Sequence, residues 1–192
     1  MLTAAERSIL RRKLERYESR IPHMYCDSKG HVTVGVGHLL ASVSDAKLCA
    51  FVDHSGRRAT ADQIAEDYDS VKKAPEGNNA AGFYRAYTKL VLPNHEIDRL
   101  TERHIASFHR ELRVIYGEFD RFPSPVRLAL FDLIFNVGAT DLRTKWPSMN
   151  KAIRVQDWEE AGRESNRPEV GLDRNTYVRE LFNAAAAMEV AQ

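Results

Sequence analysis

One short segment with a two-residue period stands in a chain that otherwise follows the periodicity of helices. Residues 31–37 read HVTVGVG, so that Val32, Val34 and Val36 fall on one face of an extended strand. The stretch 27–30 before it has the residues of a turn, and 24–26 supplies a short partner strand. The sequence therefore predicts one small β-hairpin in a mainly helical α+β protein.

Elsewhere, apolar residues recur at spacings of three and four, as on the buried face of a helix. The first expected helix opens with a capping box at Thr3 and Glu6 and is stopped by Pro22. Further N-terminal caps are expected at Ser44, Thr60 and Ser124. The expected helices cover about 3–18, 45–52, 61–73, 94–116, 124–137, 147–155, 157–165 and 173–190, and Gly138 closes the helix that begins at 124. Residues 74–89 are expected to be a surface insertion with some helical turn late in it.

The composition is that of a soluble globular chain, with 43% hydrophobic and 29% charged residues among 192. No apolar run approaches the roughly 18 residues that would cross a bilayer, and the start lacks the pattern of a signal peptide. A formal net charge of +1 argues against nucleic acid as a partner. We expect a monomer made in the cytoplasm that reaches the periplasm or cell wall by another route, such as a holin, a secretion system or carrier domains.

Cysteine and metal-ligand patterns are sparse. Cys26 and Cys49 are too few for a disulfide framework, so free buried thiols are expected. No group of His, Cys, Asp and Glu has the spacing of metal ligands, so no metal and no cofactor are expected.

Three residues suit the cleavage of a glycosidic bond, which needs two carboxyl groups on opposite sides of that bond. Glu18 lies at the end of the first helix and Asp27 at the first corner of the hairpin. Thr33 falls on the strand face opposite the valines, together with Gly35 and Gly37, and this bare strip would leave room for a ligand. Taken separately, these features have ordinary explanations. A glutamate at a helix end and an aspartate in a turn are usually solvated surface charges, and alternating Val and Thr residues in a strand usually serve packing.

The segment becomes specific when it is taken as a whole. From Glu18 to Leu40 it reads E-x8-D-x2-GHVTVGVGHLL, which closely resembles the active-site segment of glycoside hydrolase family 24. That family contains the phage-type lysozymes and the muramidase domains of pesticin-like toxins. Later stretches resemble its other signatures: IFNVG at 134–138, Ser148, and GLDR at 171–174 followed by Phe182.

The resemblance spans most of the chain and implies a lysozyme-like fold of two lobes within one catalytic domain, 1–192. A small lobe with the hairpin would cover about 19–95, and a helix over about 94–116 would connect it to a helical lobe. That helical lobe would comprise about 117–192 and the helix 3–18, with the substrate cleft between the lobes.

Carried over residue by residue, the resemblance implies an inverting N-acetylmuramidase. Glu18 matches the general acid, Asp27 the second catalytic carboxylate, and Thr33 the residue that positions the attacking water. Leu39, Phe135 and Ser148 match sugar-contacting positions, and Arg174 matches an arginine that pairs with the catalytic glutamate, the alternative for it being a surface ion pair. Asn136 either lines the cleft or caps core-helix groups. His38 is expected to support the site, although its acidic partner in the family is replaced here by His104.

Other functions compete with this one. A wall-binding or structural module would keep the cleft without catalysis, and a transglycosylase or chitinase-like activity would use the same fold. The expected partner is the glycan strand of peptidoglycan, joined by an immunity or inhibitor protein if the chain is a toxin. A phage endolysin, a bacteriocin domain and a secretion-system effector all agree with the sequence, and the insertion and neutral charge favour a toxin or effector domain.

Overall fold

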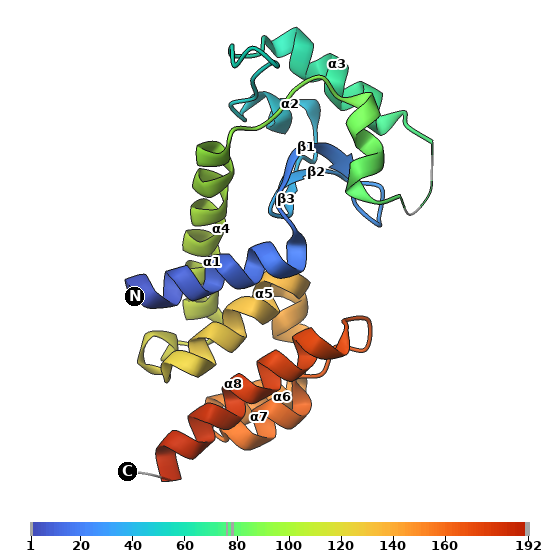
Figure 1. Cartoon of the computed structure of the whole chain (residues 1–192). Helices are drawn as coiled ribbons and strands as arrows, with labels where there is room; N and C mark the ends of the chain where they lie inside the picture. Colours follow the sequence, from blue (N-terminus) through green and yellow to red (C-terminus); the bar gives the residue numbers. More distant parts are fainter. Residues whose placement is uncertain (1, 76, 78, 191–192) are drawn as a thin grey trace. The chain divides into compact units, whose positions relative to one another are not determined.

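The computed structural model describes residues 2–75, 77 and 79–190. Over these residues the protein is a mainly helical α+β structure, as the sequence predicts, and it has a small three-stranded antiparallel sheet near its N-terminus (Figure 1). The chain forms two compact units. We call Leu14–Arg103 the sheet unit, and Met1–Lys13 together with His104–Gln192 the helical unit.

Helix α1 (Ala4–Glu18) begins at the expected capping box. Thr3 Oγ1 accepts the backbone N–H of Glu6 at 3.2 Å, and Glu6 Oε2 accepts the backbone N–H of Thr3 at 2.7 Å. The helix ends at Glu18 because Ser19 takes a left-handed conformation with a φ of 61°. Pro22 is therefore not what stops it, and this part of the prediction is wrong.

The hairpin expected from the alternating segment is present as strands β1 (Ile21–Cys26) and β2 (Val32–Gly35). A third strand, β3 (His38–Leu39), pairs with β2. The sequence does not predict β3, because a strand of two residues is too short to show a period. The strand order is β1-β2-β3, and both pairings are antiparallel.

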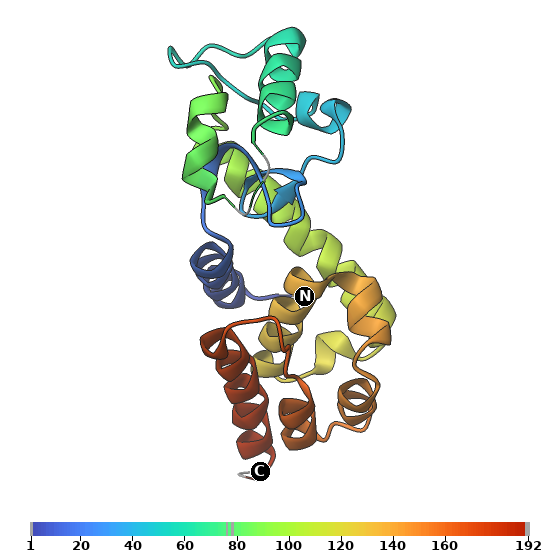
Figure 2. The ribbon, with the colours of Figure 1, turned by 90° about the vertical axis from the view of Figure 1, so that its right-hand side faces the viewer.

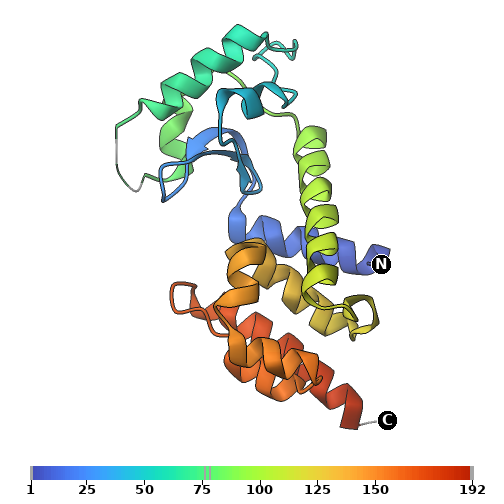
Figure 3. The same ribbon diagram turned by 180° about the vertical axis from the view of Figure 1, so that it is seen from behind.

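The sheet unit also contains α2 (Val43–Lys47), α3 (Ala61–Lys72), the 3₁₀ helix η1 (Ala81–Tyr87) and the start of α4 (Asn94–Ile115). Thr60 forms the expected capping box of α3. The predicted cap at Ser44 is wrong, because Ser42 accepts the backbone N–H of Asp45 and α2 ends at Lys47. Figure 3 shows η1 beside β1 and α3.

The stretch 74–89, expected to be a surface insertion, contains η1, and residues 76 and 78 lie outside the described residues. Asp67 of α3, a buried carboxylate, holds the end of this stretch. It accepts the hydroxyl of Thr88 at 2.5 Å and the backbone N–H groups of Lys89 and Leu90 at 2.8 Å each. The hydrogen bonds to Asp67 therefore fix residues 88–90, at the end of the insertion, against α3.

The helical unit contains the rest of α4 and the elements that follow it: η2 (Phe119–Arg121), α5 (Ser124–Thr144), α6 (Pro147–Arg154), α7 (Trp158–Glu164) and α8 (Leu172–Val190). α7 lies between α6 and α8 (Figure 2). α5 is kinked at Gly138 (φ 78°, ψ 164°), where the sequence predicts its end, and a further helical segment continues to Thr144. The large side chains buried in this unit are those of Tyr116, Phe119, Phe131, Trp158 and Phe182.

Ser124 is the first residue of α5 rather than its N-cap, so this predicted cap is also wrong. The Ser124 hydroxyl instead donates to Glu6 Oε1 at 2.6 Å. Glu6 also accepts Arg127 Nε at 3.1 Å, and its side chain is only 4% exposed. The capping glutamate of α1 thus also fixes α1 against α5.

These contacts predict a stability that depends on acid pH. Burial raises the pKa of Glu6, but hydrogen bonds from Ser124, Thr3 and Arg127 outweigh it and lower the pKa from 4.5 to about 2. Because the folded pKa is depressed, the stabilisation is complete above the unfolded pKa and is lost as the pH falls toward 2. We expect a loss of about 2–3 kcal/mol in unfolding free energy between pH 5.5 and 2.5, measured with urea. Glu6→Gln, which cannot titrate, should lose less over this interval, and an equal loss would contradict the assignment.

Over the described residues, no helix combines the length and apolarity that crossing a membrane requires. Cys26 and Cys49 are both free, as expected, although only Cys49 is fully buried.

Candidate active site

Glu18 is the last residue of α1, and the chain around it is fixed on both sides. Ser19, in its left-handed conformation, turns the backbone away from the helix. Arg20 then donates Nη1 to Glu15 Oε1 at 2.6 Å and Nη2 to Asp98 Oδ1 at 2.9 Å. Since Asp98 belongs to α4, Arg20 ties the end of α1 to the beginning of α4. The backbone that carries Glu18 is therefore well supported.

Asp27 is held by the turn that it opens. Its Oδ1 accepts the backbone N–H groups of Lys29 and His31, each at 2.9 Å, as in an Asx turn. Its Oδ2 lies 3.5 Å from His31 Nδ1. From α3, Lys72 Nζ donates to the carbonyl of Gly30 at 2.9 Å and supports the same turn. Oδ1 is thus committed to the backbone, whereas Oδ2 has only the longer contact with His31.

Thr33 is connected to Asp27 through one carbonyl group. The Thr33 hydroxyl donates to the carbonyl of His31 at 3.1 Å, and the backbone N–H of Asp27 donates to the same oxygen at 2.9 Å. The proton of the Thr33 hydroxyl is therefore in use, and its oxygen can still accept a hydrogen bond. Thr33 is buried, with only 5% of its surface exposed, so that a ligand could reach only a small part of it.

Three residues, one on each strand, form a row across the sheet. Tyr25 lies opposite Thr33, and Thr33 lies opposite Leu39. Residues directly opposite each other in antiparallel strands project from the same face. We call this set the Tyr25–Thr33–Leu39 row. Leu39, a predicted sugar contact, is 48% exposed at one end of the row, and Tyr25 is half-buried at the other.

Tyr25 lies within the electrostatic reach of both candidate carboxylates. Burial, and then the negative charges of Glu18 and Asp27, raise the pKa of its phenol to about 12. The same hydroxyl thus responds to Glu18 at the end of α1 and to Asp27 at the corner of the hairpin. Sequence reasoning missed Tyr25 because a tyrosine in a strand is usually there for packing. The available signal was its register opposite Thr33.

The expected bare strip of glycines beside Thr33 is only partly present. Gly35 has a positive φ of 70°, and a Cβ placed on it would lie 3.4 Å from Ile97 of α4. Gly35 is also buried. It therefore allows α4 to pack closely on β2, and the interpretation that it leaves room for a ligand is wrong. Gly37 is exposed, with a φ of 67°.

His38 lies on the other face of the sheet, opposite Val34 and half-buried. This position fits a supporting role better than a chemical one. His104, the position at which the resemblance predicts an acidic partner for His38, is half-buried in the helical unit, where desolvation lowers its pKa. An imidazole is neutral or positively charged, so it cannot supply the negative charge of an acid.

The other predicted site residues lie in the helical unit. Phe135 is half-buried with its ring edge-to-face on Phe108, at a centroid distance of 5.5 Å. Asn136 Oδ1 accepts Arg167 Nη1 at 3.2 Å, and Ser148 is exposed on α6. Because the predicted site draws on both units, the assembly of these residues with Glu18 and Asp27 stays a prediction.

Arg174 belongs to a buried network in the helical unit. Its Nε donates to both carboxylate oxygens of Asp132, each at 3.1 Å, and Arg167 Nη1 donates to Asp132 Oδ1 at 2.9 Å. These three residues are at most 7% exposed, so a surface ion pair is the wrong interpretation of Arg174. The pairing of Arg174 with Glu18, which would join the two units, stays a prediction.

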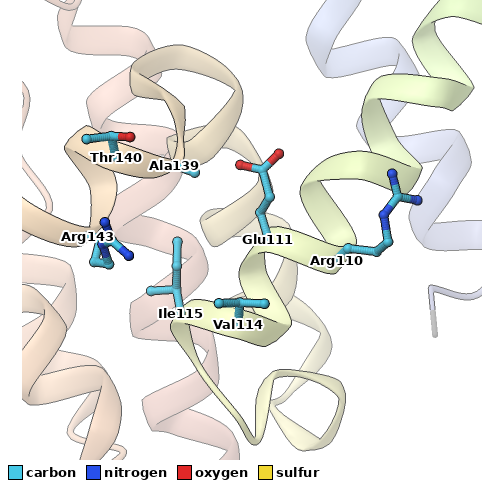
Figure 4. Close-up of a pocket in the computed structure, with 7 residues that line it drawn as sticks. All are labelled: Arg110, Glu111, Val114, Ile115, Ala139, Thr140 and Arg143. Carbon is cyan, nitrogen blue, oxygen red and sulfur yellow. The ribbon is translucent and has the colours of Figure 1, made fainter.

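A pocket of about 260 Å³ lies elsewhere in the helical unit, between the end of α4 and the part of α5 beyond Gly138 (Figure 4). Val114, Ile115 and Ala139 supply its apolar wall, with Arg110 and Arg143 at its edge. Glu111 is the one carboxyl group that lines it. Because glycosidic cleavage uses two carboxyl groups, this pocket does not suit that chemistry. In the described part of the chain, no group of three or more His, Cys, Asp or Glu residues could hold a metal ion.

No family model matches the chain, and no curated protein shows significant similarity to it. These comparisons therefore assign the chain to no family, and the resemblance of the Glu18–Leu40 segment stays a prediction from the sequence.

Proposed function

We propose that this protein is a peptidoglycan hydrolase, an N-acetylmuramidase of the phage-lysozyme type. It would cleave the β-1,4 bond between N-acetylmuramic acid and N-acetylglucosamine and invert the anomeric centre. The observation that supports this most strongly is the hairpin corner that holds Asp27 and Thr33 together: the backbone N–H of Asp27 and the hydroxyl of Thr33 donate to the same carbonyl, that of His31, at 2.9 and 3.1 Å. The negative charges of Glu18 and Asp27, from different elements, also raise the pKa of Tyr25, which lies opposite Thr33.

In this proposal Glu18 is the general acid. It gives its proton to the oxygen that leaves the anomeric carbon as the glycosidic bond breaks. A water molecule attacks the same carbon from the other side and passes a proton to Asp27. The Oδ2 of Asp27 suits this step, because Oδ1 already accepts two backbone N–H groups. Thr33 suits the holding of that water, because its hydroxyl proton is committed to His31 and its oxygen is left to accept.

A lysozyme-like fold of two lobes is part of the same proposal. The sheet unit and the helical unit would be the two lobes of a lysozyme-like fold, with the glycan strand bound by residues of both. Leu39 would contact the sugar from the sheet unit, and Phe135, Asn136 and Ser148 from the helical unit. We propose the cell wall as the place of action.

The products formed from purified sacculi test the function directly. We expect the pure protein to release muropeptides with reducing N-acetylmuramic acid ends, identified by mass spectrometry after borohydride reduction. Initial products from soluble glycan should carry the α-anomer, seen by proton NMR, because the β-bond is cleaved with inversion. Anhydro-muramic ends would show a transglycosylase, and cleavage of chitin alone would show a chitinase. Co-sedimentation with sacculi without any release would show a silent wall-binding module.

A further inference from the structure

The hydroxyl of Tyr25 is a chemical group that the proposed mechanism does not yet use. Within the part of the chain that the structure describes, it makes no hydrogen bond to a protein group and is not sealed from solvent. Its neighbours are committed elsewhere: Thr33 donates to the His31 carbonyl, and Asp27 Oδ1 accepts two backbone N–H groups. Tyr25 is therefore a half-buried donor beside the candidate acids that is available to a ligand.

The position of Tyr25 shows what kind of ligand it could meet. It shares the Tyr25–Thr33–Leu39 row, so it stands on the face that carries the candidate water-holding hydroxyl and the exposed apolar contact. Burial and the charges of Glu18 and Asp27 hold the phenol in its neutral form, with a pKa of about 12. A neutral phenol on this face of the sheet offers one proton to donate and a ring to pack. Hydroxyl and acetamide oxygens of an amino sugar are acceptors that match this group.

We propose that Tyr25 is a substrate-binding residue whose hydroxyl donates a hydrogen bond to an N-acetylated sugar held between Glu18 and Asp27. The proposal rests on the proposed function, since it takes the same face of the sheet as the glycan site. It adds a specificity: the site selects a sugar that presents an oxygen acceptor at Tyr25. A packing role for this tyrosine would need only its ring.

Tyr25→Phe separates the hydroxyl from the ring. We expect KM for soluble glycan to rise about fivefold to tenfold with kcat changed less than twofold. The reason is that the lost hydrogen bond would stabilise the bound substrate and the transition state equally. The matched control is Tyr87→Phe on η1, a half-buried tyrosine in the same unit whose ring packs on Phe83. This control should leave KM unchanged. Circular dichroism and thermal unfolding would establish that both variants are folded.

Binding measured without turnover keeps this inference distinct from the proposed function. Calorimetry would compare N-acetylchitohexaose binding to Glu18→Gln and to the double variant Glu18→Gln/Tyr25→Phe. A fivefold to tenfold weaker Kd in the double variant would support the hydrogen bond. Equal Kd values in the two proteins would overturn the role of Tyr25 while leaving the glycan site intact. No binding of the hexasaccharide or of soluble peptidoglycan fragments to Glu18→Gln would overturn the glycan site itself, and the inference with it.

Discussion

Glu18→Gln is expected to lower the rate of wall lysis by about 1,000-fold while binding to sacculi persists. A glutamine has nearly the shape of the glutamate but no proton to give to the leaving oxygen, and general acid catalysis contributes about 10²–10⁴-fold. The substitution should leave the fold unchanged, because Glu18 is only half-buried and terminates a helix. The rate would be followed as the loss of turbidity of purified sacculi, with co-sedimentation as the measure of binding.

Glu118→Gln is the matched control for this experiment. Glu118 lies in the helical unit, outside the candidate site, and pairs with Arg121 in an exposed ion pair. Its loss should change stability by no more than about 1 kcal/mol and the lytic rate by less than twofold. If Glu18→Gln lyses walls as fast as Glu118→Gln does, the proton donor is a different residue and the proposed mechanism is wrong.

Asp132→Asn is expected to lower the free energy of unfolding by about 3–5 kcal/mol. The carboxylate is the shared partner of Arg167 and Arg174, and all three side chains are nearly inaccessible to water. Removing its charge leaves two guanidinium groups buried without that counter-charge, which costs far more than the loss of an exposed pair. Urea unfolding at neutral pH, followed by circular dichroism, measures the effect.

Asp141→Asn provides the comparison on the same helix. Asp141 pairs with Lys145 at 2.7 Å, and the two side chains are 40% and 63% exposed. Its change in unfolding free energy should stay below about 1 kcal/mol. A similarly small effect for Asp132→Asn would mean that water or local rearrangement compensates the two arginines, contrary to the buried network described above.

The elements with strong local signals could be predicted from the sequence. The long helix expected over 94–116 is α4, and the capping boxes at Thr3 and Thr60 begin α1 and α3. The misassigned caps share a cause. Ser44 and Ser124 have the right residue type, but Ser42 is better placed for α2, and Ser124 is drawn to Glu6, a residue far away in the chain. A hydroxyl with two possible partners cannot be assigned from local sequence alone.

Some residues of the candidate site could likewise be predicted from local sequence, and others could not. Asp27 and Thr33 lie on a hairpin whose period is visible in the sequence, so their placement on the sheet could be expected. Gly35 could not be interpreted correctly, because its neighbour Ile97 comes from a helix more than sixty residues later. Tyr25 could have been found by counting the hairpin register. That count depends on which turn residues pair, and a bulge in β1 shifts the pairing between Ile21 and Tyr25.

The close approach of Ile97 to Gly35 bears on whether this chemistry could be transplanted. All the groups proposed to break the bond come from residues 18–39, a piece short enough to graft onto another scaffold. The parts that hold that piece in shape are borrowed from α3 and α4, through Lys72, Ile97 and Asp98. A graft of residues 18–39 alone would therefore carry the proposed catalytic groups without the contacts that hold their backbone in place. A recipient scaffold would have to provide an aliphatic side chain that packs on Gly35, as Ile97 does here.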